Sequence, residues 1–146
     1  MFFFNEQLYF DIAQVGAKCQ TLNVTSSGDD HSISMDFSVK YGPLPFTITE
    51  LYTPSDEIGM YVKRAAMPGG RLLELPPVIV DIRMDQKEGV TAFTVYSCLD
   101  FGPGVRELVI ATKDLNPPQE LLDDIVDTAL RAGVDIASDD LKKVVC

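Results

Sequence analysis

Apolar and polar residues alternate with a period of two along most of residues 1–112, which is the pattern of β-strands with one buried face. The alternation is clearest in residues 33–41, where the apolar positions are Ile33, Met35, Phe37, Val39 and Tyr41. We expect this row to face the core and the residues between to face solvent, namely Ser34, Asp36 and Ser38. Similar patterns predict strands at residues 8–12, 21–25, 46–49, 58–62, 78–84, 90–99 and 105–112.

The predicted strands follow one another through short connections rich in glycine, proline and aspartate. Consecutive strands with short connections pair as antiparallel neighbours. The sequence therefore predicts an antiparallel meander of about eight strands, as an open sheet or a barrel, in a single domain covering residues 1–146.

An amphipathic helix is predicted after the strands. Asn116, two prolines and Gln119 form a helix start signal with Asn116 as the N-cap, and Gly133 stands where a left-handed residue ends a helix. A row of apolar side chains at helical spacing is expected to pack on the sheet: Leu122, Ile125, Val126, Ala129 and Leu130. A short second helix is predicted for residues 141–146, after a cap at Ser138. The fold class is therefore α+β.

The composition is that of an ordinary globular protein, but the charge is strongly negative. Hydrophobic residues make up 46% of the chain and the formal net charge is −10. This charge disfavours direct binding to nucleic acid or anionic lipid and favours cationic partners, although it also serves solubility by itself. No apolar stretch approaches the length of a membrane-spanning helix, so no membrane span is predicted.

The cysteines indicate a reducing environment. Cys19, Cys98 and Cys146 are odd in number, widely spaced and without a C-x-x-C pair. This pattern suggests neither a disulfide framework nor a zinc site. The aromatic residues at positions 2–4 also lack the basic flank and apolar core of a secretory leader. We therefore expect an intracellular protein.

The sequence contains little candidate chemistry. His31, the single histidine, lies in a polar turn, and Cys98 lies late in an apolar strand. A surface histidine and a buried structural thiol are simpler interpretations than catalytic residues. We therefore predict no catalytic residue, cofactor or metal site, and a protein that is not an enzyme. Four carboxylates lie opposite the apolar side of the helix and form either a solvated face or a docking surface for a basic partner: Glu120, Asp123, Asp124 and Asp127.

Three segments carry a family resemblance. They are PFTITE (Pro45–Glu50), PPVIVDIRMDQKEGVTAFTVYSC (Pro76–Cys98) and LLDDIVDTALRAGVD (Leu121–Asp135). They resemble the first strand entry, the hairpin and the closing helix of the mitochondrial p32 family (MAM33, complement C1q-binding-protein-like). The resemblance implies an acidic, non-enzymatic, oligomeric protein of the mitochondrial matrix that binds basic partners.

Function is left with competing hypotheses. The leading one is a non-catalytic acidic binding or scaffold protein, p32-like or a subunit of a larger assembly, that engages basic protein partners through the helix carboxylates. The alternative is a small-molecule-binding β-barrel with a C-terminal helix, whose cavity is lined by Phe37, Phe46, Phe93 and Tyr96. An enzyme that uses His31 or a carboxylate pair is the third.

Overall fold

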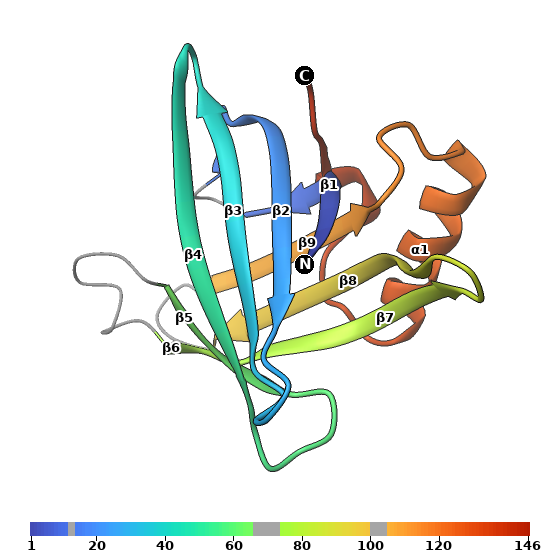
Figure 1. Ribbon diagram of the computed structural model, residues 1–146. Helices are drawn as coiled ribbons and strands as arrows, with labels where there is room; N and C mark the ends of the chain where they lie inside the picture. The colour runs from blue at the N-terminus through green and yellow to red at the C-terminus, as the bar shows by residue number, and fades with distance from the viewer. Residues whose placement is uncertain (12–13, 66–73, 100–104) are drawn as a thin grey trace.

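The computed structural model describes residues 1–11, 14–65, 74–99 and 105–146 and shows a curled antiparallel sheet with one helix beside it (Figure 1). The strand order in the sheet is β6-β5-β4-β3-β2-β1-β9-β8-β7. The α+β fold is as predicted, and each predicted strand overlaps an observed one. The strands are β1 (Phe2–Phe10), β2 (Lys18–Ser26), β3 (Ile33–Tyr41), β4 (Leu44–Pro54), β5 (Tyr61–Ala65), β6 (Glu74–Leu75), β7 (Pro77–Asp85), β8 (Gly89–Leu99) and β9 (Val105–Thr112).

The two ends of this strand order approach each other, so the curled sheet forms a half-barrel. Met60, just before β5, forms an antiparallel bridge with Val78 of β7. The amide of Ile79 also donates a hydrogen bond to the carbonyl oxygen of Gly59 at 3.1 Å. These two contacts favour a barrel-like arrangement over a flat open sheet, and they protect this part of the strand edges from exposure.

The alternation in β3 produces the predicted two faces. Met35, Phe37 and Val39 are buried inside the barrel, and Ile33 packs partly buried against the same cluster. The polar residues between them lie on the other face and are half-buried, not fully exposed to solvent. There, Thr49 donates a hydrogen bond of 2.6 Å to Asp36.

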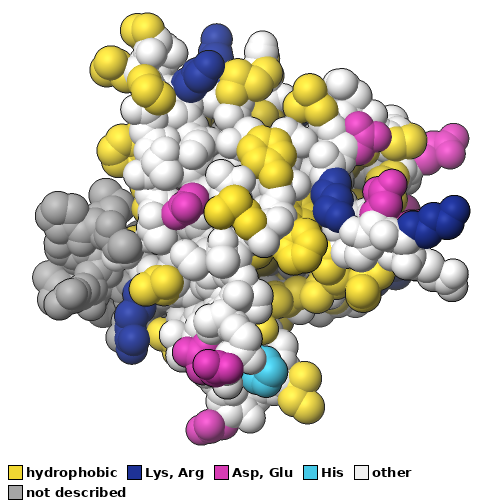
Figure 2. Space-filling model, viewed as in Figure 1, with side chains coloured by type: hydrophobic (Ala, Val, Ile, Leu, Met, Phe, Trp, Pro, Cys, Tyr) yellow, Lys and Arg dark blue, Asp and Glu magenta, His cyan; other side chains and the backbone are white. Residues whose placement is uncertain are grey.

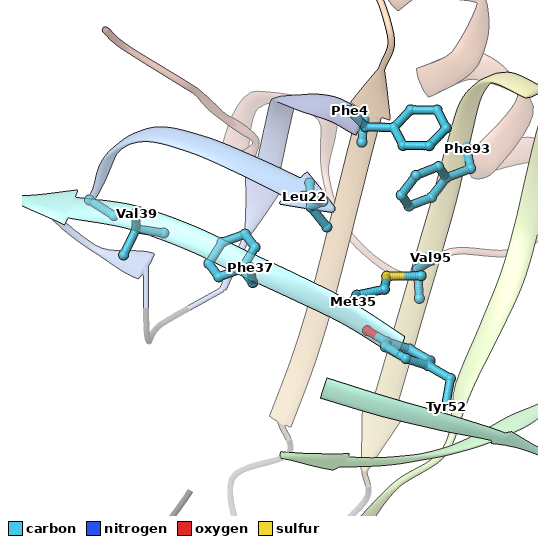
Figure 3. Close-up of a cluster of buried hydrophobic side chains, with 10 residues drawn as sticks. Phe4, Leu22, Met35, Phe37, Val39, Tyr52, Phe93 and Val95 are labelled. Carbon is cyan, nitrogen blue, oxygen red and sulfur yellow. The ribbon is translucent and has the colours of Figure 1, made fainter. Parts of the chain in front are cut away.

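A cluster of apolar side chains fills part of the barrel interior (Figure 3). Phe4 of β1 and Phe93 of β8 meet edge to face, with 4.9 Å between ring centroids. The cluster draws on strands from around the barrel, so burial of these side chains holds the curled sheet together. Its other buried members are Ala17, Leu22, Met35, Phe37, Val39, Tyr52, Val95 and Ala111.

Helix α1 (Gln119–Arg131) packs on the outer face of the barrel, beside β7 and β8 (Figure 1). Ile125 and Ala129 are each 1% exposed and form a second apolar cluster with residues of β8 and β9. The predicted packing is confirmed for Leu122, Ile125 and Ala129, but Leu130 is 37% exposed and lies off the buried stripe. Arg83 of β7 ties the helix to the barrel through an ion pair of 2.7 Å with Asp124.

The ends of the helix differ in how well they were predicted. The helix begins at Gln119, with Pro118 at the N-cap position and no side-chain cap. Instead, the backbone N–H of Asn116 donates a hydrogen bond of 3.0 Å to Asp114 Oδ1. Asn116 therefore belongs to the preceding turn, which corrects its assignment as the cap. Gly133 adopts a φ of +96° directly after the C-cap Ala132, as predicted.

The C-terminal segment is extended, contrary to the predicted second helix. A 3-10 turn (Ser138–Asp140) leads into the short strand β10 (Lys142–Lys143), which pairs with β1. β-Branched valines follow, and such residues favour extended structure. Cys146 then forms a disulfide with Cys19, 127 residues away, so the prediction without a disulfide is wrong. In the described part of the chain, no helix is long and apolar enough to cross a membrane.

Candidate functional site

Charged side chains cross the interior of the barrel. The Lys63 ammonium group on β5 lies 2.6 and 2.7 Å from the two carboxylate oxygens of Glu107 on β9, and 3.3 Å from Glu50 Oε1 on β4. Strands β5 and β9 are not neighbours in the sheet, so the Lys63–Glu107 pair spans the interior. The Lys63 side chain is only 7% exposed, and a charge at that depth requires a partner.

Tyr52 joins this charged network to the apolar cluster. Its hydroxyl donates a hydrogen bond of 2.6 Å to Glu50 Oε2, while its ring packs in the cluster (Figure 3). Burial raises the pKa of Tyr52 well above its ordinary value, and the Glu50 carboxylate raises it further. Burial also raises the pKa of Glu107, although the Lys63 ammonium opposes this. Burial lowers the pKa of Lys63, but attraction to Glu107 and Glu50 outweighs it and leaves that pKa raised.

Glu6 of β1 is buried near this network, and no described ion pair includes it. It follows Phe4 by two residues on the inner face of β1 and is 2% exposed. Neither of its carboxylate oxygens has a hydrogen-bond partner of regular geometry within the described residues, although the Gln14 side chain is near enough to act on it. Burial raises the pKa of Glu6 well above its ordinary value. The Gln14 amide opposes this rise, and the charges of Asp11, Glu107 and Glu50 add to it.

Gln20 adds a second unsatisfied acceptor. The pairing of Asn5 with Thr21 places Gln20 beside Glu6 in the β1–β2 hairpin. Gln20 is 1% exposed and donates a hydrogen bond of 3.3 Å to Gln14 Oε1. Its own side-chain oxygen has no partner among the residues that the structure describes. Glu6 and Gln20 therefore leave three buried acceptor oxygens unpaired, which is costly in a native protein.

A cavity of about 280 Å³ lies between β1, β2, the start of α1 and the C-terminal residues, and its lining includes Glu6 and Gln20. Two outward-facing polar side chains in its wall have partners. Asn5 donates to the Lys113 carbonyl oxygen at 3.1 Å, and Gln7 donates to Thr112 Oγ1 at 3.0 Å. Among the residues that line the cavity, the buried oxygens without a hydrogen-bond partner belong to Glu6 and Gln20.

The four aromatic residues predicted to line a cavity are not all inside the barrel. Phe37 and Phe93 belong to the interior cluster. Phe46 pairs directly with Val39 and shares its inner face, but it is 45% exposed. Tyr96 packs against the helix-side cluster, so its assignment to the interior is wrong. Residues an odd number apart in a regular strand point to opposite faces, which separates Tyr96 from Phe93.

The predicted acidic face is on the surface of α1. Glu120, Asp123 and Asp127 are exposed, and Asp123 accepts a hydrogen bond of 2.8 Å from Gln119. Asp124 is 54% exposed in its side chain and is engaged by Arg83 of the same chain. The face is therefore partly occupied by internal pairing, and the barrel interior is a separate site.

Neither His31 nor Cys98 joins the interior charges. His31 is exposed in the β2–β3 turn with a φ of +57°, and Figure 2 shows it at the surface beside acidic side chains. Cys98 is half-buried near the end of β8 and lies outside the disulfide. Across the described ranges, no group of three or more histidine, cysteine, aspartate or glutamate side chains is placed to hold a metal ion.

Comparison with known proteins identifies the fold. No protein-family model matches the chain, and no curated protein sequence is significantly similar to it. Lobster apocrustacyanin A1 is similar in structure, with a TM-score of 0.75 and 11% identity over 99% of this chain and 76% of that chain. The siderocalin Ex-FABP is similar with a TM-score of 0.70 and 7% identity, over 99% of this chain and 92% of that chain. The bovine lipocalin allergen Bos d 2 is similar with a TM-score of 0.70 and 13% identity, over 96% of this chain and 88% of that chain. The chain therefore has the lipocalin fold.

This finding corrects the family resemblance and the leading hypothesis. The similar structures are lipocalins, so the resemblance to the p32 family is wrong, and the p32-like mitochondrial scaffold is wrong with it. The inferred basic protein partners and oligomeric assembly rested on that scaffold and on the acidic face, and they are corrected too. The fold matches the alternative hypothesis, a β-barrel with a C-terminal helix.

Proposed function

We propose that the protein binds a small organic molecule inside its barrel and acts by binding rather than by catalysis. The observation that carries this proposal is the composition of the interior, where an aromatic and aliphatic cluster adjoins a few buried polar groups. Small-molecule sites in proteins have this composition, because apolar surface supplies affinity and a few polar groups fix orientation. The similar siderocalin Ex-FABP functions through dual ligand specificities, which supports the proposal by analogy of fold.

The disulfide bears on where the protein acts. The expected intracellular location stays a prediction, but one of its grounds was the apparent lack of a disulfide. Disulfides persist mainly in oxidising compartments, so the Cys19–Cys146 bond favours an oxidising compartment instead.

Binding is tested with N-phenyl-1-naphthylamine, a neutral apolar dye whose fluorescence increases when it leaves water. The wild type is expected to bind it saturably at one site. Val39→Trp adds bulk to the inner face beside Phe46 and should weaken dye binding by about tenfold or more, the loss expected when about 1.4 kcal/mol of contact is removed.

Leu115→Trp provides the matched control. Leu115 is 60% exposed and lines the cavity beside α1, so the same aromatic addition there should leave dye binding unchanged. Circular dichroism and the unfolding midpoint establish that both variants fold. Absence of saturable binding by the wild type, or equal binding by a folded Val39→Trp variant, would refute the proposed function.

A further inference from the structure

We infer that the ligand of the barrel is cationic, a small organic ammonium ion with an apolar body, and that Glu6 is the residue that binds its charged group. This inference rests on the proposed function and names its ligand class. It starts from the imbalance of charge inside the barrel. Among the described interior residues, the Lys63 ammonium is shared by Glu50 and Glu107, and no cation is paired with Glu6.

The unpaired atoms near Glu6 are all hydrogen-bond acceptors. They are the two carboxylate oxygens of Glu6 and the side-chain oxygen of Gln20, each buried from solvent. An ammonium group carries only donors and a positive charge, so it satisfies these atoms and offsets the carboxylate. An anionic ligand would instead meet carboxylates at close range and leave the acceptors unpaired.

The apolar body of the ligand follows from what adjoins the carboxylates. Phe4 precedes Glu6 on the inner face of β1 and packs edge to face on Phe93. A ligand whose ammonium group meets Glu6 therefore has aromatic surface next to it, where an aryl or alkyl group is favoured over water.

Proton release provides a signature of this mode of binding. Buried Glu6 holds its proton more strongly than an exposed glutamate. The titratable groups that act on it are Asp11 after β1, Glu50 and Tyr52 of β4, and Glu107 of β9. Lys63 of β5 is paired with Glu50 and Glu107. An ammonium ion favours the ionised carboxylate, so binding releases a proton from Glu6 at pH values below its raised pKa. Affinity for the cation should therefore increase with pH, while affinity for a neutral ligand should not.

The experiment compares three probes of similar shape that displace the dye: 2-phenylethylamine, 2-phenylethanol and 3-phenylpropanoate. We expect the amine to bind about tenfold or more tightly than the alcohol, because hydrogen bonds to an ionised group are roughly twice as strong as those between neutral groups. The propanoate should bind least tightly. Glu6→Gln should abolish the preference for the amine and leave dye and alcohol binding intact, whereas Asp123→Asn on the exposed helix face should change nothing.

Proton release by the wild type is measured by calorimetry in two buffers of different ionisation heat, so the test does not depend on the folding of any variant. Equal binding of amine and alcohol with the dye still bound would overturn this inference and leave the proposed function standing. Tighter binding of the propanoate, displacement of the dye by Ca²⁺ alone, or an unchanged amine preference in Glu6→Gln would also overturn it. If neither the dye nor the alcohol binds, the proposed function itself fails, and this inference with it.

Discussion

Replacing Lys63 by methionine should destabilise the protein strongly, because Lys63 is the partner of two buried carboxylates. The substitution keeps most of the side-chain volume but removes the ammonium group that lies 2.6 Å from Glu107 and 3.3 Å from Glu50. The three side chains are 7%, 15% and 19% exposed, so water cannot compensate fully for the lost pair. Removal of one partner from a buried ion pair typically costs about 3–5 kcal/mol.

The size of this effect can be measured as a melting temperature. For a chain of 146 residues, each kcal/mol lost lowers the melting temperature by about 3 °C, so the expected decrease is about 10–15 °C at neutral pH. The deficit should shrink as the pH falls toward 4.5, the ordinary pKa of a glutamate, because the unpaired carboxylates then become protonated and neutral.

Two further variants isolate the ion pair from general damage. Lys63→Met combined with Glu107→Gln should recover most of the loss, because the buried charge that lacked a partner is then absent. Lys40→Met, at an exposed position of β3, should change the free energy of unfolding by less than about 0.5 kcal/mol. The assignment is refuted if Lys63→Met is as stable as Lys40→Met, or if the double variant is no more stable than Lys63→Met alone.

Three other substitutions test the rest of the structure. The folded pKa of Glu6 lies above its ordinary value of 4.5, so the wild type loses stability as the pH rises from there toward the folded pKa. Glu6→Gln should therefore raise the free energy of unfolding by about 1–3 kcal/mol at neutral pH and change it little near pH 4.5, as measured by urea unfolding. A difference between variant and wild type that does not vary with pH would contradict this. Ile125→Ala should cost about 2–5 kcal/mol and Leu130→Ala much less, because only Ile125 is buried against the barrel; equal losses in chemical unfolding would mean that the helix packs differently. Replacing Cys19 and Cys146 together by serine should cost about 2–5 kcal/mol, since the bond closes a long loop, and unchanged stability under oxidising conditions would indicate that the bond does not form.

The parts of the fold that could be predicted are those set by neighbours in the chain. Residues 33–41 fix two faces by strict alternation, and the helix stripe of Leu122, Ile125 and Ala129 is fixed by helical spacing. The error at Tyr96 was avoidable, because Phe93 and Tyr96 are three residues apart and cannot share a face of a regular strand. The resemblance to the p32 family failed because strand, turn and helix-end patterns occur in many unrelated folds.

The candidate site could not be predicted because it is assembled from distant residues. Lys63 and Glu107 are 44 residues apart on strands that are not neighbours in the sheet, so no local pattern pairs them. Glu6 did leave a signal, since it is a charged residue two positions after Phe4 and therefore on the same face of the strand. A charged side chain on the inward face of a strand is either paired with a residue distant in sequence or left unpaired in the folded chain. Only the three-dimensional structure shows which of the two applies.

The most direct test of the central claim is a methyl NMR titration with 2-phenylethylamine, which reports where in the protein the ligand binds. Selectively labelled methyl groups divide into an interior set, with Leu22, Met35, Val39 and Val95, and a helix-side set, with Leu108, Ile110, Ile125 and Val134. Binding inside the barrel beside Glu6 predicts saturable shifts in the interior set, with the helix-side set nearly unchanged. Shifts confined to the helix-side set or to Leu115 and Leu122 of the cavity beside α1, or no saturable shifts at all, would contradict a ligand site in the barrel interior.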